Sequence, residues 1–342
     1  MSVTQIKDPR VVQLIDANLD RAREGLRVLE EWCRYGIYRK DLVIKIKDLR
    51  QQLGYLHKES YKRARALGKD KGLGLTHPIQ ETRQVAEEII SANCGRVQEA
   101  LRVLEEFTKE IDPILANYSH KVRYETYELE LTIIKASTRA KRRKSLENCK
   151  LCLITKESPN LLNIVRESLH SGVRMVQYRN KKANDINKLN EAKELSSLCK
   201  KFNALFIIND RIDIAIASNA DGVHLGENDI PPKVAREILG EEMLIGVTTH
   251  SLENLISDES DYIGLGPIYT SSTKPDLKAS GLDYVREASE KLAIPWFAIG
   301  GINESNANEV ISAGAKKIAV IDAIMGSENP SNATSNLLKN IQ

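Results

Sequence analysis

The stretch Gly264-Leu-Gly-Pro-Ile-Tyr-Thr-Ser-Ser-Thr-Lys274 carries the pattern from which the fold of this chain is best deduced. The apolar run Tyr262–Ile268 predicts a buried strand that leads directly into a hydroxylated loop ending in a lysine. Glycine allows the backbone to approach a ligand closely. Ser271 and Thr273 carry hydroxyls that hydrogen-bond phosphate oxygens, and Lys274 adds a positive charge. The segment therefore predicts an anion-binding loop at the end of a strand.

Apolar runs of this kind recur through the second half of the chain and alternate with helical patterns. Eight such runs, separated by helices in about 190 residues, predict an α/β fold, a (β/α)8 TIM barrel. A doubly wound sheet is the alternative. Polar residues follow nearly every run, and a closed barrel gathers all of them on one face, which favours the barrel. The predicted strands are Leu151–Thr155, Val173–Tyr178, Ala204–Asn209, Gly222–Leu225, Leu244–Thr248, Tyr262–Ile268, Trp296–Ile299 and Ile318–Ile321.

Polar side chains after the second, third and fourth predicted strands indicate a metal–diphosphate site. Gln177 and Arg179 fall on the same side of their strand because side chains alternate, and Lys181 follows them. Asp210 and Asp229 come after the next two strands, and Mg²⁺ takes one or two carboxylates together with phosphate oxygens. Each aspartate is also placed to cap the helix after it. Their coincidence with the basic residues favours a diphosphate substrate bound with Mg²⁺.

A second anion site is predicted after the seventh and eighth strands. Gly300 and Gly301 follow the seventh strand, and Ile321 and Asp322 end the eighth. Barrels of this type frequently bind a phosphate there through backbone amides. A diphosphate on one side of the mouth and a monophosphate on the other predict an enzyme that joins two phosphorylated molecules by group transfer.

Six motifs follow one another through the second half of the chain. They are VQYRNK (176–181), IINDR (207–211), DGVHLGENDIP (221–231), IGVTTH (245–250), GLGPIYTSSTK (264–274) and AIGGI (298–302). Together they give residues 151–326 a plain resemblance to thiamine-phosphate synthase, a family of barrel enzymes. The resemblance implies condensation of 4-amino-2-methyl-5-(diphosphooxymethyl)pyrimidine with 4-methyl-5-(2-phosphooxyethyl)thiazole, or its carboxylated precursor, to give thiamine phosphate and diphosphate. A family relative that aromatises the thiazole on the same barrel is an alternative activity.

The resemblance also implies a role for each site residue. The implied cofactor is Mg²⁺, held by Asp210 and Asp229. Contacts to the pyrimidine diphosphate are implied for Gln177, Tyr178, Arg179, Asn180, Lys181, Asn209, Thr248 and Lys274. Of these, the residues implied to act in catalysis are Arg179, Lys181, Thr248 and Lys274. Contacts to the thiazole phosphate are implied for Ser271, Ser272, Thr273, Gly301, Ile321 and Asp322.

Three residues depart from the family pattern. Glu227 stands where the family usually has Gln, and Ser271 where Thr is frequent. Asp322 stands where a small or basic residue is usual, so a carboxylate lies near the expected phosphate. We expect no penalty if backbone N–H groups bind the phosphate while the carboxylate points away, and weakened affinity for the thiazole phosphate otherwise.

Residues 1–140 predict an all-α domain with an internal duplication. Ala17–Glu31 recurs as Ala92–Glu106, with ten of fifteen positions identical. Helices predicted at Lys40–Leu56 and Pro113–Ala136 follow the two copies, so we expect two helical hairpins in one bundle. The run 68–74 is the predicted joint between the hairpins. Residues 141–150 are predicted to be an exposed basic linker, followed by the barrel domain at 151–342.

The role of the helical domain is left open. The resemblance matches it to an N-terminal extension of such synthases in cyanobacteria and some other bacteria, similar to a domain proposed as an alternative hydroxymethylpyrimidine-phosphate kinase. A regulatory or oligomerisation module is another hypothesis. The sequence shows no glycine-rich nucleotide loop and no kinase lysine motif. This favours a structural role, in which the repeated charged residues form ion pairs that brace the helices, and argues against a phosphate site. The repeated candidates are Asn18/Asn93, Arg21/Arg96, Glu24/Glu99 and Arg27/Arg102.

Composition excludes several classes of protein. Of the 342 residues, 42% are apolar, so a large core is expected, yet no apolar run approaches the roughly 18–20 residues of a bilayer span. Cys149 and Cys152 form a C-x-x-C without the further ligands of a zinc site. The net charge is +3, and the short basic run at 139–144 lacks the aromatic residues of a nucleic-acid surface. We therefore expect a cytoplasmic enzyme of phosphorylated small molecules, with no nucleic-acid or membrane partner and with homo-oligomerisation left open.

Overall fold

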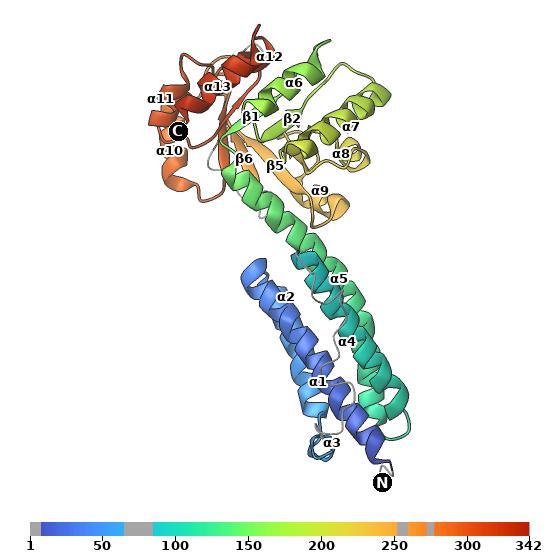
Figure 1. Cartoon of the computed structure of the whole chain (residues 1–342). Coiled ribbons are helices and arrows are strands. Elements are labelled where there is room, and N and C mark those ends of the chain that lie inside the picture. Colours follow the sequence, from blue (N-terminus) through green and yellow to red (C-terminus); the bar gives the residue numbers. More distant parts are fainter. Residues whose placement is uncertain (1–7, 65–84, 252–258, 272–276, 342) are drawn as a thin grey trace. The chain divides into compact units, whose positions relative to one another are not determined.

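The computed structural model describes residues 8–64, 85–251, 259–271 and 277–341 (Figure 1). The chain divides into two compact units, Met1–Thr138 and Arg139–Gln342. The first unit is helical, and the second is a barrel with surrounding helices. Within the described ranges, no helix is both long enough and apolar enough to cross a membrane.

The helical unit is organised around the two repeated segments. They form α1 (Pro9–Glu31) and α4 (Ala86–Thr108), each of 23 residues. The helices pack closely because a Cβ at Gly25 would lie only 2.5 Å from the Val97 side chain, so glycine permits the contact. The other elements are the π-helix η1 (Trp32–Gly36), α2 (Lys40–Leu56), α3 (Glu59–Lys62) and α5 (Pro113–Asn148). The predicted joint at 68–74 lies outside the described residues.

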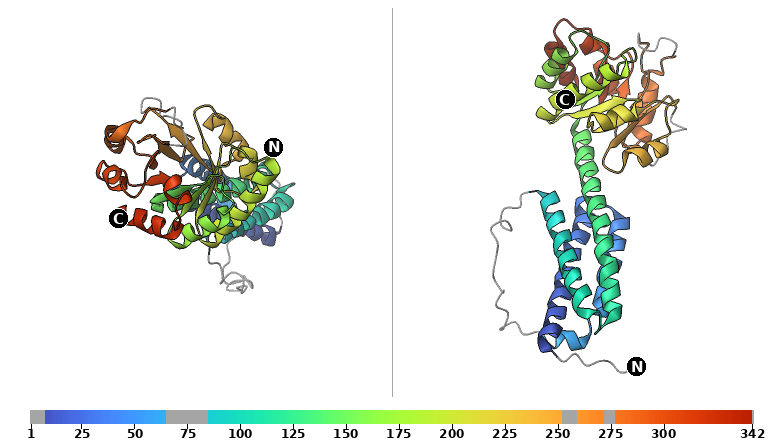
Figure 2. Two further views of the ribbon diagram at one scale, coloured as in Figure 1. Left: turned by 90° about the horizontal axis from the view of Figure 1, so that it is seen from above. Right: turned by 90° about the vertical axis from the view of Figure 1, so that its right-hand side faces the viewer.

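The second unit is a closed barrel of eight parallel strands, β1 to β8 in sequence order, as predicted. Closure excludes the doubly wound sheet, because β1 pairs with β8 as well as with β2. The left view of Figure 2 shows the strands at the centre of this unit with helices around them. The strands are β1 (Leu151–Ile154), β2 (Met175–Tyr178), β3 (Leu205–Asn209), β4 (Gly222–Leu225), β5 (Leu244–Thr249), β6 (Tyr262–Leu265), β7 (Trp296–Ile299) and β8 (Ile318–Val320).

Alternate strand residues fill two separate apolar layers, as strand periodicity requires. Val176, Phe206 and Ile263 pack outward against the helices. Met175 and Tyr262 point inward with the other residues that fill the barrel. The helices are α6 (Leu161–His170), α7 (Asp185–Lys201), α8 (Ile212–Ala217), α9 (Pro232–Leu239), α10 (Gly281–Lys291), α11 (Ala307–Ser312), α12 (Asp322–Met325) and α13 (Pro330–Asn340).

The basic segment expected to be an exposed linker is instead the end of a helix packed on the barrel, so that prediction was wrong. Helix α5 continues to Asn148. Arg139 and Arg143 each donate from Nε to Asp261 Oδ1, at 3.0 and 2.5 Å. Arg142 Nε donates to Asp221 Oδ1 at 2.9 Å. These arginines belong structurally to the barrel unit, so a fragment meant to contain the whole barrel should begin at or before residue 139.

Replacing Asp261 by alanine should strongly destabilise the barrel unit. Its side chain is fully buried and also accepts hydrogen bonds from Arg236 and from the Ile245 backbone N–H. Without the carboxylate, buried guanidinium groups lose their counter-charge, which costs about 3–5 kcal/mol, or about 10 °C in melting temperature. Thermal unfolding followed by circular dichroism measures the shift.

Asp283→Ala is the matched control for Asp261→Ala. Asp283 also pairs with an arginine, but its side chain is 97% exposed. Exposed ion pairs contribute little, so its variant should melt within about 2 °C of the parent. Equal melting temperatures for the two variants would contradict a structural role for Asp261.

Candidate active site at the mouth of the barrel

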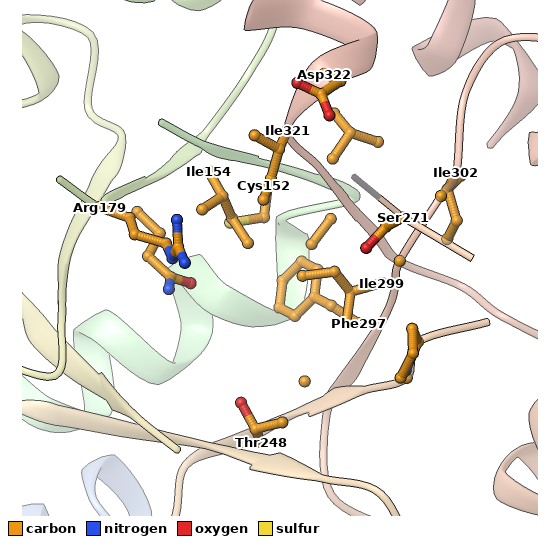
Figure 3. A pocket seen from close by; sticks show the side chains of 18 of the residues that line it. Cys152, Ile154, Arg179, Thr248, Ser271, Phe297, Ile299, Ile302, Ile321 and Asp322 are labelled. Carbon is orange, nitrogen blue, oxygen red and sulfur yellow. The ribbon is translucent and has the colours of Figure 1, made fainter. Parts of the chain in front are cut away.

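A cavity of about 360 Å³ lies at the C-terminal ends of the strands. Figure 3 shows Arg179 on one side of it and Ser271 and Asp322 on the other, with Thr248 on a third side. The side chains of Cys152 and Phe297 lie between them and belong to the apolar filling of the barrel. The mouth therefore combines polar walls with an apolar floor, as small-molecule sites generally do.

One wall consists of the side chains that end β2 and β3. Gln177 Nε2 donates to Asn209 Oδ1 at 2.8 Å, which ties the two strand ends together. The backbone N–H of Arg179 donates to Thr155 Oγ1 at 2.9 Å, so the residue is anchored to the end of β1. In Figure 3 the Arg179 side chain points into the cavity. The structure thus brings Gln177, Arg179 and Asn209 into one wall.

Asp210 and Asp229 lie in contact after β3 and β4. Burial raises the pKa of Asp210, and the neighbouring Asp229 carboxylate raises it further. Asp229 Oδ2 accepts the Gly226 backbone N–H at 2.7 Å, and Lys181 Nζ lies 3.7 Å from Asp210 Oδ2. Lys181 and Arg179 act in the opposite direction, but the pKa of Asp210 is raised on balance, so the two adjacent carboxylates favour a proton or an added cation between them.

This donor set fits Mg²⁺. In the described part of the chain, no three His, Cys, Asp or Glu side chains gather to hold a metal. A cation at Asp210 and Asp229 would therefore take its remaining ligands from water or from a substrate. Mg²⁺ is typically bound in this way, by one or two carboxylates together with substrate phosphates.

The opposite wall comes from the loops after β6, β7 and β8. Gly300 and Gly301 have φ values of 101° and 66°, a region that favours glycine. Both glycines line the cavity, together with Ser271, Ile321 and Asp322. The Asp322 carboxylate does not stand alone, because its Oδ1 accepts a hydrogen bond from Lys156 Nζ at 2.5 Å. Asp322, the acidic residue that departs from the family pattern, is thus paired with Lys156 from the loop after β1.

Two histidines of the cavity were missing from the predicted site. His224 is buried and contacts Thr248 Oγ1 through Nε2 at 2.9 Å and the Tyr262 hydroxyl through Nδ1 at 3.2 Å. His250 Nδ1 hydrogen-bonds the Gly266 carbonyl. His224 pairs in register with Asn209, so alternation along β4 contained the signal that could have placed it in the cavity.

Glu227 connects two of the loops at the mouth of the barrel. Its Oε1 accepts the backbone N–H of His250 at 3.3 Å, which links the loops after β4 and β5. A glutamine side-chain oxygen could accept the same bond. Glutamate in place of glutamine at position 227 therefore preserves the hydrogen bond to His250 and adds a negative charge beside it.

Tyr178 and Asn180, for which the resemblance implies contacts to the pyrimidine diphosphate, do not line the main cavity. Tyr178 is buried in the outer apolar layer, and its hydroxyl donates to Glu191 at 2.7 Å. Asn180 Oδ1 accepts the backbone N–H groups of Lys182 and Ala183, each at 3.1 Å, and so stabilises the turn. Both residues instead border a smaller cavity of about 180 Å³, as do Lys181 and Asp210. Ser272, Thr273 and Lys274 lie outside the described residues.

Comparison with known proteins agrees with this geometry. Residues 151–324 match the family described as thiamine monophosphate synthase, and residues 13–132 match the ThiD2 family. A thiamine-phosphate synthase of Prochlorococcus marinus (strain MIT 9303) is 53% identical over 99% of this chain and 98% of its own length. One from Parasynechococcus marenigrum (strain WH8102) is 50% identical over 98% and 97%.

A solved structure gives the same result for the barrel alone. The thiamine phosphate pyrophosphorylase of Pyrococcus furiosus is 38% identical, with a TM-score of 0.53, and the match covers 58% of this chain and 97% of that chain. The family matches, the full-length relatives and the barrel geometry agree, and the chain belongs to the thiamine-phosphate synthase family.

Proposed function

We propose that the mouth of the barrel binds the pyrimidine diphosphate at Gln177, Arg179, Lys181, Asn209 and Thr248, and the thiazole phosphate at the opposite wall. The reaction is the condensation of the two moieties to thiamine phosphate. The observation that supports this is the division of charge and glycine around the barrel mouth. Arg179 lines one side of the cavity, and Lys181 and Asp210 border a smaller cavity that shares Asn209 with it, while two glycines of positive φ line the other side. Lys274, Ser272 and Thr273 remain proposed contacts from the sequence.

The implied cation is Mg²⁺, with Asp210 and Asp229 as its protein ligands. When bound there, it supplies positive charge to the diphosphate oxygens as the leaving group becomes more negative. Arg179 and Lys181 add charge from the protein, in a site where the apolar floor excludes water and strengthens electrostatic interactions. This assignment is supported by the raised pKa of Asp210, since burial and the adjacent carboxylate both disfavour an uncompensated negative charge there.

The proposed chemistry needs no protein nucleophile. The bond from the pyrimidine methylene carbon to the diphosphate oxygen breaks, and diphosphate leaves with the electron pair. The thiazole nitrogen donates its lone pair to that carbon and forms the new C–N bond. Cys152 lines the cavity, but burial raises the pKa of its thiol, so it stays protonated and acts as part of the apolar floor.

His224 and Thr248 are proposed to orient the pyrimidine ring. Their side chains are hydrogen-bonded to each other, and His224 is fixed from its other nitrogen by Tyr262. Because these two side chains are already fixed beside the apolar base of the cavity, little further entropy is lost when they position a heteroaromatic ring. The thiazole-aromatising alternative requires no diphosphate site, so the paired carboxylates with Arg179 and Lys181 favour condensation.

A direct assay tests the proposal. The purified full chain should form thiamine phosphate and diphosphate from the two phosphorylated substrates, as measured by chromatography of the oxidised, fluorescent product. Removal of divalent ions with EDTA should abolish the activity, and Mg²⁺ should restore it. Activity that survives EDTA would contradict the proposed cation, and absence of product with Mg²⁺ would contradict condensation. We also propose a cytoplasmic location, because all five cysteines are free, as in a reducing compartment.

The helical unit has a second candidate function, phosphorylation of hydroxymethylpyrimidine phosphate. The match of residues 13–132 to the ThiD2 family favours this alternative. The contacts of the repeated residues favour bracing. Asn18 and Asn93 are buried, and each donates to a carbonyl of its own helix four residues back, at 2.9 and 2.7 Å. Buried Glu30 and its repeat Glu105 each accept from arginines, namely Arg27, Arg34 and Arg50 for Glu30 and Arg102 and Arg123 for Glu105.

The double variant Arg21→Ala/Arg96→Ala tests this assignment in the full chain. Arg21 is exposed, and Arg96 donates to Asn93 Oδ1 at 2.6 Å. If these residues only brace the bundle, the melting temperature should fall by a few degrees, about 2–4 °C, and synthesis of thiamine phosphate should be unchanged. An ATP-dependent conversion of the pyrimidine monophosphate that the wild type performs and the double variant has lost would instead establish the kinase site.

A further inference from the structure

We propose that Lys156 is the side chain that binds the phosphate of the thiazole substrate, with Asp322 holding its ammonium group in place. The inference rests on the proposed placement of the thiazole phosphate at the loops after β7 and β8. Lys156 belongs to none of the six motifs in the sequence and lies two residues after the end of β1.

Lys156 is held so that its side chain reaches across to β8. Thr155, the preceding residue, is fully buried, and its N–H donates to the Gln177 carbonyl at 2.9 Å while its Oγ1 accepts from Arg179. The Lys156 ammonium then lies 2.5 Å from Asp322 Oδ1. It also lies 3.9 Å from where a Cβ on Gly326 would be, which places it beside α12. Lys156, in the loop after β1, thus places its positive charge beside the end of β8.

The charges of the described residues that line the cavity favour such a group. Among the described residues that line it, the Lys, Arg, Asp and Glu side chains are only Arg179 and Asp322. Arg179 follows β2, on the side assigned to the diphosphate, and Asp322 stands on the side assigned to the monophosphate (Figure 3). A phosphate entering there would meet a carboxylate. Lys156 neutralises Asp322 and makes this side compatible with an anion.

The pair can accept a phosphate without being taken apart. An ammonium group has three donors, so Lys156 can keep its bond to Asp322 and give another to a phosphate oxygen. The side chains of Lys156 and Asp322 are 42% and 47% exposed, so solvent reaches both and rearrangement is inexpensive. Asp322 then acts as a positioning residue, which keeps the lysine at the rim and limits its rotamers.

A phosphate contact remote from the reacting nitrogen contributes to binding more than to the chemical step. Interactions that are equal in the ground state and in the transition state change KM and leave kcat unchanged. Lys156→Ala should therefore raise the KM for thiazole phosphate by about tenfold. The kcat and the KM for the pyrimidine diphosphate should stay within about twofold. Lys156→Arg should retain most of the affinity, because it keeps the charge and the donors.

Lys182→Ala is the matched control. It removes the same charge from the neighbouring loop, where Lys182 pairs with Glu157 at 3.2 Å and its side chain is 83% exposed. Neither lysine is itself a lining residue, but Lys156 pairs with Asp322, which lines the cavity, whereas Glu157, the partner of Lys182, does not. Steady-state kinetics in full-length protein at fixed ionic strength compare the variants, and circular dichroism verifies that each is folded. An unchanged KM for thiazole phosphate in Lys156→Ala, or an equal rise in Lys182→Ala, would overturn the proposal.

The double variant Lys156→Ala/Asp322→Asn separates phosphate binding from simple neutralisation of Asp322. If Lys156 binds the phosphate, its removal should still raise the KM at least about fivefold when Asp322→Asn is the starting protein. A return of the double variant to the wild-type KM would show that Lys156 only screens Asp322. A rise confined to the KM for pyrimidine diphosphate would place Lys156 at the other site, and either result overturns the proposal.

The failure of this inference is distinguishable from failure of the proposed function. A wild-type chain that forms no thiamine phosphate contradicts the function itself. A wild-type chain that is active and whose Lys156→Ala variant has unchanged kinetics contradicts only the assignment of Lys156.

Discussion

The Asp210→Asn variant should lose at least about a hundredfold in kcat/KM while becoming no less stable. The activity should fall because the proposed cation loses one of its two carboxylate ligands. The stability should not fall, because burial and Asp229 raise the pKa of Asp210 in the folded protein. An acid whose pKa is raised on folding costs stability once the pH is high enough to ionise it, so its neutral isostere removes that cost at pH 7. Kinetics with Mg²⁺ and melting temperatures in EDTA measure the two effects.

Asp213→Asn is the control for Asp210→Asn. Asp213 lies three residues further along, pairs with Arg211 at 2.5 Å and has a side chain that is 62% exposed. The hydrogen bond from Arg211 lowers the pKa of Asp213, which is the opposite direction from Asp210. Its variant should keep full activity and lose a little stability. Activity of Asp210→Asn near that of Asp213→Asn would rule out a metal ligand at Asp210.

The pH dependence of cation binding supplies an independent check on Asp210. Protons and Mg²⁺ compete for a carboxylate, and the pKa of Asp210 is raised in the protein without the ion. The apparent affinity for Mg²⁺ should therefore weaken as the pH falls through this raised pKa, at a pH where an ordinary aspartate would still be ionised. An affinity that does not change over the acidic range would contradict the assignment.

The barrel could be predicted because its strands are short, buried on both faces and separated by helices. Such strands give continuous apolar runs, and Gly222–Leu225 and Trp296–Ile299 were predicted with the bounds that the structure has. The sixth strand was predicted too long. It ends at Leu265, because the following Gly266–Pro267 leaves the ladder and proline has no N–H to donate. Apolarity continues to Ile268, so hydropathy gives no sign of this end, whereas Pro267 in the sequence does.

The ion pairs between the C-terminal end of α5 and the barrel could not be predicted, because their acidic partners are distant in the sequence. Arg139 and Arg143 meet Asp261 across 122 and 118 residues. A run of basic residues has the same appearance whether water or a buried carboxylate surrounds it. The contact between Lys156 and Asp322 spans 166 residues and was missed for the same reason. Local patterns predict elements well, whereas pairing between distant polar side chains emerges only with the tertiary fold.

The proposed site was predicted where alternation along a strand determines which side chains point inward. Gln177 and Asn209 meet in the wall of the cavity because they occupy inward positions on neighbouring strands. Tyr178 is the outward neighbour of Gln177, and the same rule that places one in the cavity removes the other. The resemblance had implied a contact for both. The two-residue period therefore separates the two residues, and the contact implied for Tyr178 stays a prediction.

Gly301→Ala should impair both stability and use of the thiazole phosphate. Gly301 has a φ of 66°, and a Cβ there would lie 2.6 Å from the Thr270 carbonyl oxygen and 2.7 Å from Tyr269 Cβ. The left-handed backbone and the overlap with main-chain atoms together cost about 2–5 kcal/mol. The Thr270 backbone leads into Ser271, so relief of the overlap displaces two of the loops that form the proposed phosphate site. We expect kcat/KM for the thiazole phosphate to fall about a hundredfold.

Gly281→Ala separates the two causes. Gly281 has a similar φ of 74°, but no atom lies within 4 Å of its ideal Cβ position, and it lines no part of the cavity. Backbone strain alone should lower its melting temperature by a few degrees, about 2–4 °C, and leave the kinetics unchanged. If the KM for thiazole phosphate in Gly301→Ala changes as little as in Gly281→Ala, then close packing at Gly301 serves only the fold. A selective rise in that KM in Gly301→Ala, with the KM for pyrimidine diphosphate unchanged, ties the glycine to the monophosphate side of the barrel.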